Sequence, residues 1–186
     1  MPFIKTPFSG LLIIEPVVFE DSRGYFFESY NEMQFTNEGI EIKFVQDNQA
    51  RSNYGVIRGL HYQLNPYAQT KLIRVISGSI QDVAVDIRFG SPTWGKVYAT
   101  VLSAENKRQL LIPKGFAHGY SVISETAEVF YKCDKSYHKD AEGGISYNDP
   151  ELAIDWMIPA DRAIVSAKDL QYPTLAYCNN NFTFEQ

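Results

Sequence analysis

Short strand-like segments separated by turn residues fill the middle of this 186-residue chain, and this pattern limits the possible folds more than any other feature. The segment SIQDVAVDIR, residues 79–88, alternates with a period of two. One face of this segment carries Val83, Val85 and Ile87, and the other carries Asp82, Asp86 and Arg88. Turn signals such as GSPTWG and EGG punctuate the chain, and five further strand candidates are KLIRVI, KVYATVL, QLLIP, GYSVI and AEVFYK.

This pattern predicts a mainly β fold, a jelly-roll barrel with a few short helices, formed by a single domain over residues 1–186. An open β-sandwich is the alternative architecture. Helical signals are restricted to NEMQFTNEG at 31–39, PELAIDW at 150–156 and SAKDLQ at 166–171. The high aromatic content, with 12 Tyr and 12 Phe, also favours β structure.

Charge and cysteine content argue against several classes of protein. A net charge of −5 argues against binding to nucleic acid or to a membrane surface through bulk charge. The two cysteines, Cys133 and Cys178, form no paired motif and are expected to be reduced thiols in a cytoplasmic protein. We expect no signal peptide, because Glu15 and Pro16 interrupt the N-terminal apolar run, and no run approaches the ~20 residues of a membrane span.

Strand parity predicts which polar side chains point into the barrel. In AEVFYK, Tyr131 shares a face with Val129, and in KLIRVI, Lys71 shares a face with Ile73 and Val75. Both polar tips are therefore predicted to face the interior. Each side chain taken alone has a plainer interpretation, as a tyrosine with its hydroxyl at the rim and a lysine that extends to water.

The segment IRGLHYQ, residues 57–63, does not fit a flat strand. Arg58 and His61 have opposite parity and would point to opposite faces. A bulge at Gly59 would bring both side chains to one side, because glycine tolerates the required backbone conformation.

A metal site is one possible use of His61. The segment PKGFAH, residues 113–118, resembles half of the metal-binding pattern of small β-barrels, but His61-Tyr62-Gln63 lacks the second histidine and the nearby glutamate. His61 and His118 alone would make a poor site for a transition metal. We therefore predict no metal. Acid–base chemistry remains, in which a neutral histidine takes a proton, a carboxylate orients it, a tyrosine returns a proton and a cation stabilises an oxyanion.

Several segments, in this order, resemble the dTDP-4-dehydrorhamnose 3,5-epimerase family of nucleotide-sugar epimerases. They are EDSRGYFFESY at 20–30, FVQDNQARS at 44–52, VIRGLHYQ at 56–63, KLIRVISGSIQDVAVDIR at 71–88, IPKGFAHGY at 112–120 and VSAKDLQYP at 165–173. The resemblance covers residues 3 to 178 approximately. It implies a cupin-type jelly roll that forms a homodimer and uses no metal or organic cofactor.

The resemblance also implies roles for individual residues. His61 would be the general base with Asp169 as its partner, Tyr131 the general acid and Lys71 the stabiliser of the enolate oxygen. The residues that would hold the sugar and the diphosphate are Arg23, Glu28, Gln46, Asn48, Arg58, His118, Glu142 and Lys168. Tyr137 would stack on the thymine ring. Arg23 and Glu28 would reach the site across a dimer interface.

The substrate implied by the resemblance is dTDP-4-dehydro-6-deoxy-D-glucose, whose carbons 3 and 5 flank a ketone. Loss of a proton from either carbon gives an enolate that needs a cation nearby, as Lys71 would supply. The alternatives are an epimerase acting on one carbon only, a ketoisomerase, a metal-dependent cupin and a non-catalytic module that binds a nucleotide sugar.

Overall fold

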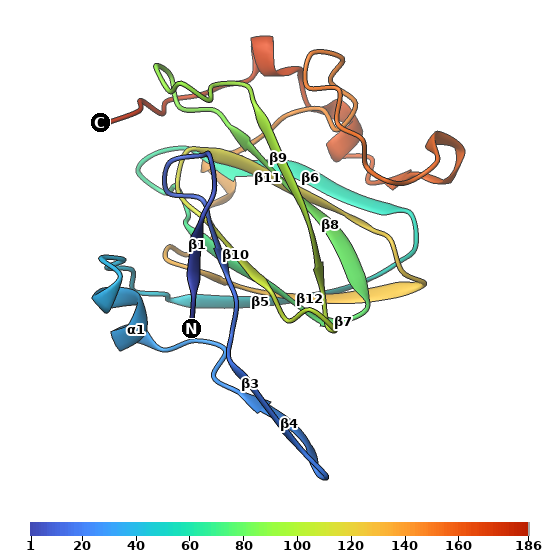
Figure 1. Ribbon diagram of the computed structural model, residues 1–186. Helices are drawn as coiled ribbons and strands as arrows, with labels where there is room; N and C mark the ends of the chain where they lie inside the picture. Colours follow the sequence, from blue (N-terminus) through green and yellow to red (C-terminus); the bar gives the residue numbers. More distant parts are fainter. Residues whose placement is uncertain (186) are drawn as a thin grey trace.

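Two β-sheets packed face to face form the body of the protein, which we describe from a computed structural model covering residues 1–185 (Figure 1). The first sheet has the strand order β1 (Phe3–Lys5), β2 (Leu12–Ile14), β10 (Gln109–Ile112), β7 (Lys71–Ser77), β12 (Thr126–Cys133) and β5 (Gln46–Asn53). The second has the order β13 (Glu142–Gly144), β6 (Val56–Gln63), β11 (Phe116–Val122), β8 (Ser79–Asp86) and β9 (Val97–Ser103). Strand β14 (Ile164–Val165) pairs in parallel with β6. The predicted mainly β fold is confirmed, as are all six of the strands expected from the sequence.

Helices are few and short. Helix α1 (Glu32–Asn37) confirms the helix expected at 31–39, and the side chain of Asn31 caps it by accepting from the Gln34 amide. The remaining helical segments are the 3₁₀ turns η1 (Lys139–Ala141), η2 (Ala160–Arg162), η3 (Asp169–Gln171) and η4 (Leu175–Tyr177). The segment 166–171 therefore contains only one 3₁₀ turn.

The helix expected at 150–156 is wrong, because tertiary contacts override the local signal. Ala153 has a φ of 45°, which is incompatible with a right-handed helix. The indole of the buried Trp156 donates to the Tyr147 carbonyl at 2.7 Å, and Asp149 Oδ1 accepts from the Glu151 amide at 2.8 Å. The segment is an irregular cover for the second sheet.

The protein has three apolar layers. The central layer lies between the sheets and includes Ile73 and Val75 of β7 and Ile80 and Ala84 of β8. The outer face of the second sheet is covered by the C-terminal segment, seen at the top of Figure 1 in orange and red. The outer face of the first sheet is covered by α1 and its neighbours, where Phe35 is fully buried.

The two faces of strand β8 pack in different surroundings, and the charged one faces the interior. Val83 and Val85 pack outward against the C-terminal cover, so the apolar face is not the interior face. Asp82 shares the inward face with Ile80 and Ala84, and it is completely buried. A buried carboxylate needs hydrogen-bond donors, which indicates a polar site inside the barrel.

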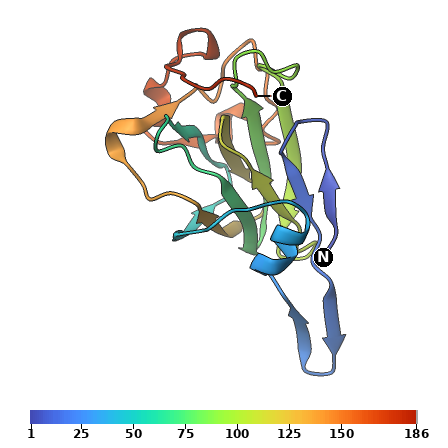
Figure 2. The ribbon, with the colours of Figure 1, turned by 90° about the vertical axis from the view of Figure 1, so that its left-hand side faces the viewer.

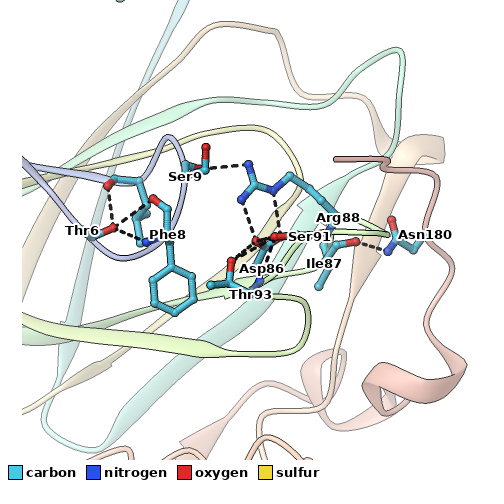
Figure 3. A network of polar contacts seen from close by, with 10 residues as sticks. Thr6, Phe8, Ser9, Asp86, Ile87, Arg88, Ser91, Thr93 and Asn180 are labelled. Atoms are coloured by element: carbon cyan, nitrogen blue, oxygen red, sulfur yellow. Dashed lines mark hydrogen bonds and ion pairs between the residues drawn. The ribbon is translucent and has the colours of Figure 1, made fainter. Parts of the chain in front are cut away.

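A second buried carboxylate, Asp86, lies at the centre of a network of polar contacts (Figure 3). Asp86 accepts from the guanidinium of Arg88 and from the hydroxyls of Ser91 and Thr93, at distances between 2.6 and 2.9 Å. Arg88 also donates to the Ser9 carbonyl at 3.1 Å, which connects the N-terminal loop to this network. All these groups are paired with one another, so the network is structural.

The hairpin of β3 (Val18–Asp21) and β4 (Gly24–Phe27) projects away from the body (Figures 1 and 2). It forms a separate two-stranded sheet and exposes the apolar side chains of Phe19, Tyr25 and Phe26. No helix in the described residues is long and apolar enough to cross a membrane.

Candidate active site

A polar cavity opens between the two sheets. Its inner part, about 230 Å³, is lined by Ala50, Arg58, His61, Lys71, His118, Tyr120 and Tyr131. An adjoining outer part of about 370 Å³ shares three of these residues and adds Gln46, Asn48, Tyr62, Gln63, Gln69, Tyr137 and Glu142. Most residues expected at the site from the sequence therefore line one cavity.

A bulge in β6 brings Arg58 and His61 to the same side. His61 is opposite His118 on β11, whereas Arg58 is opposite Tyr120, so β6 has one residue more than β11 between these pairs. Gly59 within the bulge has a φ of 122°, and a Cβ there would lie 2.5 Å from the Gly119 Cα. The predicted role of Gly59 is confirmed.

His61 and Asp169 form a hydrogen-bonded pair. The Nε2 atom of His61 lies 2.8 Å from Asp169 Oδ1, and the Gly59 amide donates to Oδ2 at 3.2 Å. Burial alone would raise the pKa of Asp169, but hydrogen bonds from His61, Gly59 and Ser166 outweigh burial and lower it below its usual value. An ionised carboxylate only accepts hydrogen bonds, so Nε2 carries a proton and Nδ1 of the neutral ring holds a free lone pair.

Tyr131 and Lys71 reach the cavity from the opposite sheet. They lie on the neighbouring strands β12 and β7, and Tyr131 packs against the central apolar layer. The predicted inward orientation of both side chains is confirmed. Burial raises the pKa of Tyr131 and lowers the pKa of Lys71. No ion pair within residues 1–185 includes Lys71, so its ammonium group is available to an anionic ligand.

A second histidine–aspartate pair lies deeper. His118 Nε2 is 3.0 Å from both carboxylate oxygens of Asp82. Both residues are buried, and His118 also lines the inner cavity. Asp82 holds the ring of His118 in a fixed orientation toward the cavity.

A cluster around Glu142 forms the rim of the outer cavity. Glu142 accepts from Tyr137 Oη at 2.8 Å, from Tyr172 Oη at 3.3 Å and from Lys168 Nζ. Burial alone would raise the pKa of Glu142, but the hydrogen bonds from Lys168 and Tyr137 lower it. Tyr172 also packs edge-on against the His61 ring, with the ring centroids 5.7 Å apart. The rim is thereby linked to the proposed base.

Gln46 and Asn48 on β5 line the same outer cavity. Gln46 Nε2 donates to Asn48 Oδ1 at 3.0 Å, and Gln46 Oε1 accepts from the Tyr137 amide at 2.9 Å. Asn48 Nδ2 also lies 3.7 Å from the Cys133 sulfur. These amides position the loop that carries Tyr137, whose ring is 55% exposed and accessible to a planar ligand.

Arg23 and Glu28 are the two expected site residues that line none of the cavities around His61. Lys168 and Asp169, in contrast, line a neighbouring cavity that also includes His61. Arg23 is at the hairpin turn, almost fully exposed and paired with Asp21 at 2.5 Å. Glu28 accepts from Gln34 Nε2 at 2.6 Å. Within one chain, neither residue lines the cavity that contains His61.

Among the cavity and site residues missed in the sequence, three polar ones contact the two histidines or line the inner cavity. They are Asp82, Tyr120 and Tyr172. The aspartate was visible in the sequence only as a member of the charged face of an alternating strand, which is also the pattern of a face exposed to solvent. The two tyrosines had no signal in the sequence, because their positions depend on the bulge and on the path of the C-terminal segment.

The two cysteines and the possible metal ligands are alternative reactive groups in the chain. Cys133 and Cys178 are free thiols, as predicted. Within the part of the chain that the structure describes, no three His, Cys, Asp or Glu side chains converge as a metal site would require. The Nε2 atoms of His61 and His118 are each bonded to a carboxylate.

Comparison with known proteins finds close similarity to one family of enzymes. A relative from Shigella flexneri, a dTDP-4-dehydrorhamnose 3,5-epimerase, is 52% identical over 171 residues, covering 91% of this chain and 93% of the relative. The crystal structure of such an epimerase from Elizabethkingia anophelis superposes with a TM-score of 0.89 at 52% identity, covering 94% of this chain and 96% of that one. The epimerase from Legionella pneumophila, solved in complex with dTDP-4-keto-L-rhamnose, gives a TM-score of 0.90 at 47% identity, covering 95% and 93%.

The fold and the relatives define a cupin-type isomerase of the jelly-roll class, with a polar cavity between its two sheets. The sequence profile of the dTDP-4-dehydrorhamnose 3,5-epimerase family matches residues 5–177. The chain belongs to this family, and the resemblance inferred from its motifs is confirmed.

Proposed function

We propose that this protein inverts carbons 3 and 5 of dTDP-4-dehydro-6-deoxy-D-glucose to give dTDP-4-dehydro-L-rhamnose. The observation that carries this proposal is the arrangement of three groups around one cavity. The His61–Asp169 pair enters from one sheet, and Tyr131 and Lys71 enter from the other. Inversion at carbon requires a base and an acid on opposite sides of the sugar ring, and this arrangement supplies both.

The reaction proceeds through an enolate. His61 Nδ1 removes the proton from carbon 3 or carbon 5, and the electron pair of the C–H bond forms a double bond to carbon 4. The C4 carbonyl π electrons move to its oxygen, where the ammonium group of Lys71 stabilises the negative charge. Tyr131 then donates its proton to the opposite face of the same carbon. Exchange with solvent returns a proton to the tyrosinate and removes one from the imidazolium before the second inversion.

The electrostatics of the site suit these roles. The ionised Asp169 stabilises the imidazolium that forms when His61 accepts a proton. The raised pKa of Tyr131 keeps its hydroxyl protonated at neutral pH, so it can act as an acid. The mechanism needs no metal, and that expectation is tested below with a chelator.

The nucleotide would bind along the rim. Arg58 and Lys168 line a neighbouring cavity of about 290 Å³ and would hold the diphosphate despite the acidic net charge. Tyr137 would stack on the thymine ring, with its hydroxyl fixed by Glu142. Gln46, Asn48 and His118 would make hydrogen bonds to the bound nucleotide sugar.

The hairpin supports a homodimer. Its exposed Phe19, Tyr25 and Phe26 line an open pocket with a volume of about 520 Å³, which the body of the same chain does not fill. Docking on a second copy would bury these rings and bring the hairpin's Arg23 and Glu28 to the partner's cavity. A cytoplasmic location follows from the proposed nucleotide-sugar substrate and is compatible with the two free thiols.

Hydrogen exchange at carbons 3 and 5 tests the proposed function. The protein is incubated in deuterated buffer with the 4-keto substrate and a chelator, and both carbons are followed by NMR. Deuterium at both positions, together with a reductase-trapped rhamnose-configured product, is the expected result. Deuterium at one carbon would instead identify a single-site epimerase, movement of the carbonyl a ketoisomerase, and binding without exchange a nucleotide-sugar receptor. Loss of activity with chelator would contradict the metal-free mechanism.

A further inference from the structure

One polar group in the cavity has no partner. The hydroxyl of Tyr120 is buried and receives no hydrogen bond from any residue in the described chain, and the whole side chain is only 5% exposed. Tyr120 lines the inner cavity beside Arg58, Lys71 and Tyr131. Burying a hydroxyl without a partner costs free energy, so such a group at the wall of a ligand cavity indicates a ligand contact.

Within residues 1–185, the neighbouring side chains, including the nearby Ser52, make no hydrogen bond of normal geometry to this hydroxyl. Arg58, the cross-strand partner of Tyr120, donates its Nε to Ser52 Oγ at 3.1 Å. His118 is bonded to Asp82. Burial raises the pKa of Tyr120 to about 12 despite the nearby Arg58 and Ser52, so the hydroxyl keeps its proton and can both donate and accept.

With the substrate proposed above, the position of Tyr120 indicates which end of the sugar ring it would contact. In the proposed substrate, the C4 oxygen would face Lys71 and the diphosphate on carbon 1 would face Arg58. Tyr120 is directly opposite Arg58 across the two strands, so it would lie at the carbon 1 end of the bound sugar. Apart from the oxygen that joins carbon 1 to the diphosphate, two oxygen atoms of the sugar lie near carbon 1. One is the ring oxygen, and the other is the hydroxyl on carbon 2.

The chemistry of the reaction favours the C2 hydroxyl. The hydroxyl on carbon 3 changes its direction when that carbon inverts, so a fixed tyrosine cannot hold it throughout. The C2 hydroxyl keeps its configuration, and it can donate and accept, whereas the ring oxygen is only an acceptor. We propose that Tyr120 hydrogen-bonds to the C2 hydroxyl of the sugar and makes the enzyme selective for nucleotide sugars that carry this hydroxyl.

A double-mutant cycle with unreactive ligands tests this inference. Calorimetry measures the affinity of wild-type protein and Tyr120→Phe for dTDP-6-deoxy-D-glucose, for its 2-deoxy counterpart and for dTDP alone. The control variant is Tyr98→Phe, since Tyr98 is a half-buried tyrosine packed on the same central layer but outside the cavity. Unchanged binding of dTDP to Tyr120→Phe verifies that the variant is folded.

The expected result is a loss of about fivefold to tenfold in affinity of Tyr120→Phe for the sugar with the C2 hydroxyl. The 2-deoxy sugar should bind both proteins equally, and Tyr98→Phe should resemble wild type with every ligand. An equal loss for both sugars, or no loss for either, would overturn the assignment. Because these ligands do not react, the cycle remains informative even where the hydrogen-exchange experiment contradicts the epimerase function.

Discussion

Replacement of Asp169 by asparagine tests the base assignment most directly. The change keeps the shape of the side chain but removes its charge. Asp169 is buried and accepts hydrogen bonds from both His61 Nε2 and the Gly59 amide. An asparagine whose oxygen accepts from Gly59 would present its amide NH₂ to His61, so Nε2 would have to accept and Nδ1 would carry the proton. The ring would then have no lone pair directed at the sugar.

The size of the effect follows from the distance between the two groups. When His61 takes a proton, the imidazolium and the carboxylate are in direct contact at 2.8 Å between Nε2 and Oδ1. With their charge centres about 4 Å apart, the attraction is about 4 kcal/mol at an effective dielectric constant of about 20. Loss of this term from the transition state lowers kcat about 10³-fold.

The assay is the rate of deuterium incorporation at carbons 3 and 5 under saturating substrate. The matched control is Asp149→Asn, because Asp149 is another buried aspartate that accepts from backbone amides, those of Glu151 and Leu175, outside the cavity. The control should lose stability and keep its exchange rate. If Asp169→Asn exchanged within about threefold of wild type, or lost only substrate affinity, Asp169 would not be the partner of the base.

Three further predictions concern other parts of the molecule. Tyr131→Phe should still exchange hydrogen at carbon 3 through His61 while product inversion, followed by NMR, is impaired; full inversion would assign the acid elsewhere. Because burial lowers the pKa of Lys71, kcat should fall as the pH rises toward the ordinary lysine value of 10.5, and Lys71→Arg should move this fall to higher pH; an unmoved profile would exclude Lys71. Asp86→Ala should reduce the free energy of unfolding in urea by about 3–5 kcal/mol, since it leaves the guanidinium of Arg88 unpaired, with kcat unchanged.

The inward side chains of the first sheet could be predicted because strand parity is a local property. Alternation alone assigned Lys71 and Tyr131 to the interior, and both line the cavity. The mismatch between Arg58 and His61 was also local, and it required the bulge at Gly59 that the structure contains. For Lys71 on β7 and Tyr131 on β12, strand parity alone was sufficient to predict the inward orientation.

The remaining parts of the site depend on contacts between distant segments. Asp169 reaches His61 only because β14 pairs with β6 and directs the chain back across the second sheet. Trp156 is buried in the same cover, which replaces the helix that its local sequence favours. The apolar face of β8 packs under this cover, and the sequence could not distinguish the cover side from the barrel interior.

The position of the site inside the barrel explains how ordinary side chains acquire their proposed roles. Lysine and tyrosine have similar pKa values in water, about 10.4 and 10. Burial disfavours the charged form of each, so it lowers the pKa of Lys71 and raises the pKa of Tyr131. The tyrosine is therefore the weaker acid, and it stays protonated until a strongly basic carbanion forms beside it. Lys71 has no ion-pair partner among residues 1–185, and the poor solvation of its ammonium group would be relieved when an enolate oxygen forms beside it. One physical cause, removal from water, thus prepares both groups for the same intermediate.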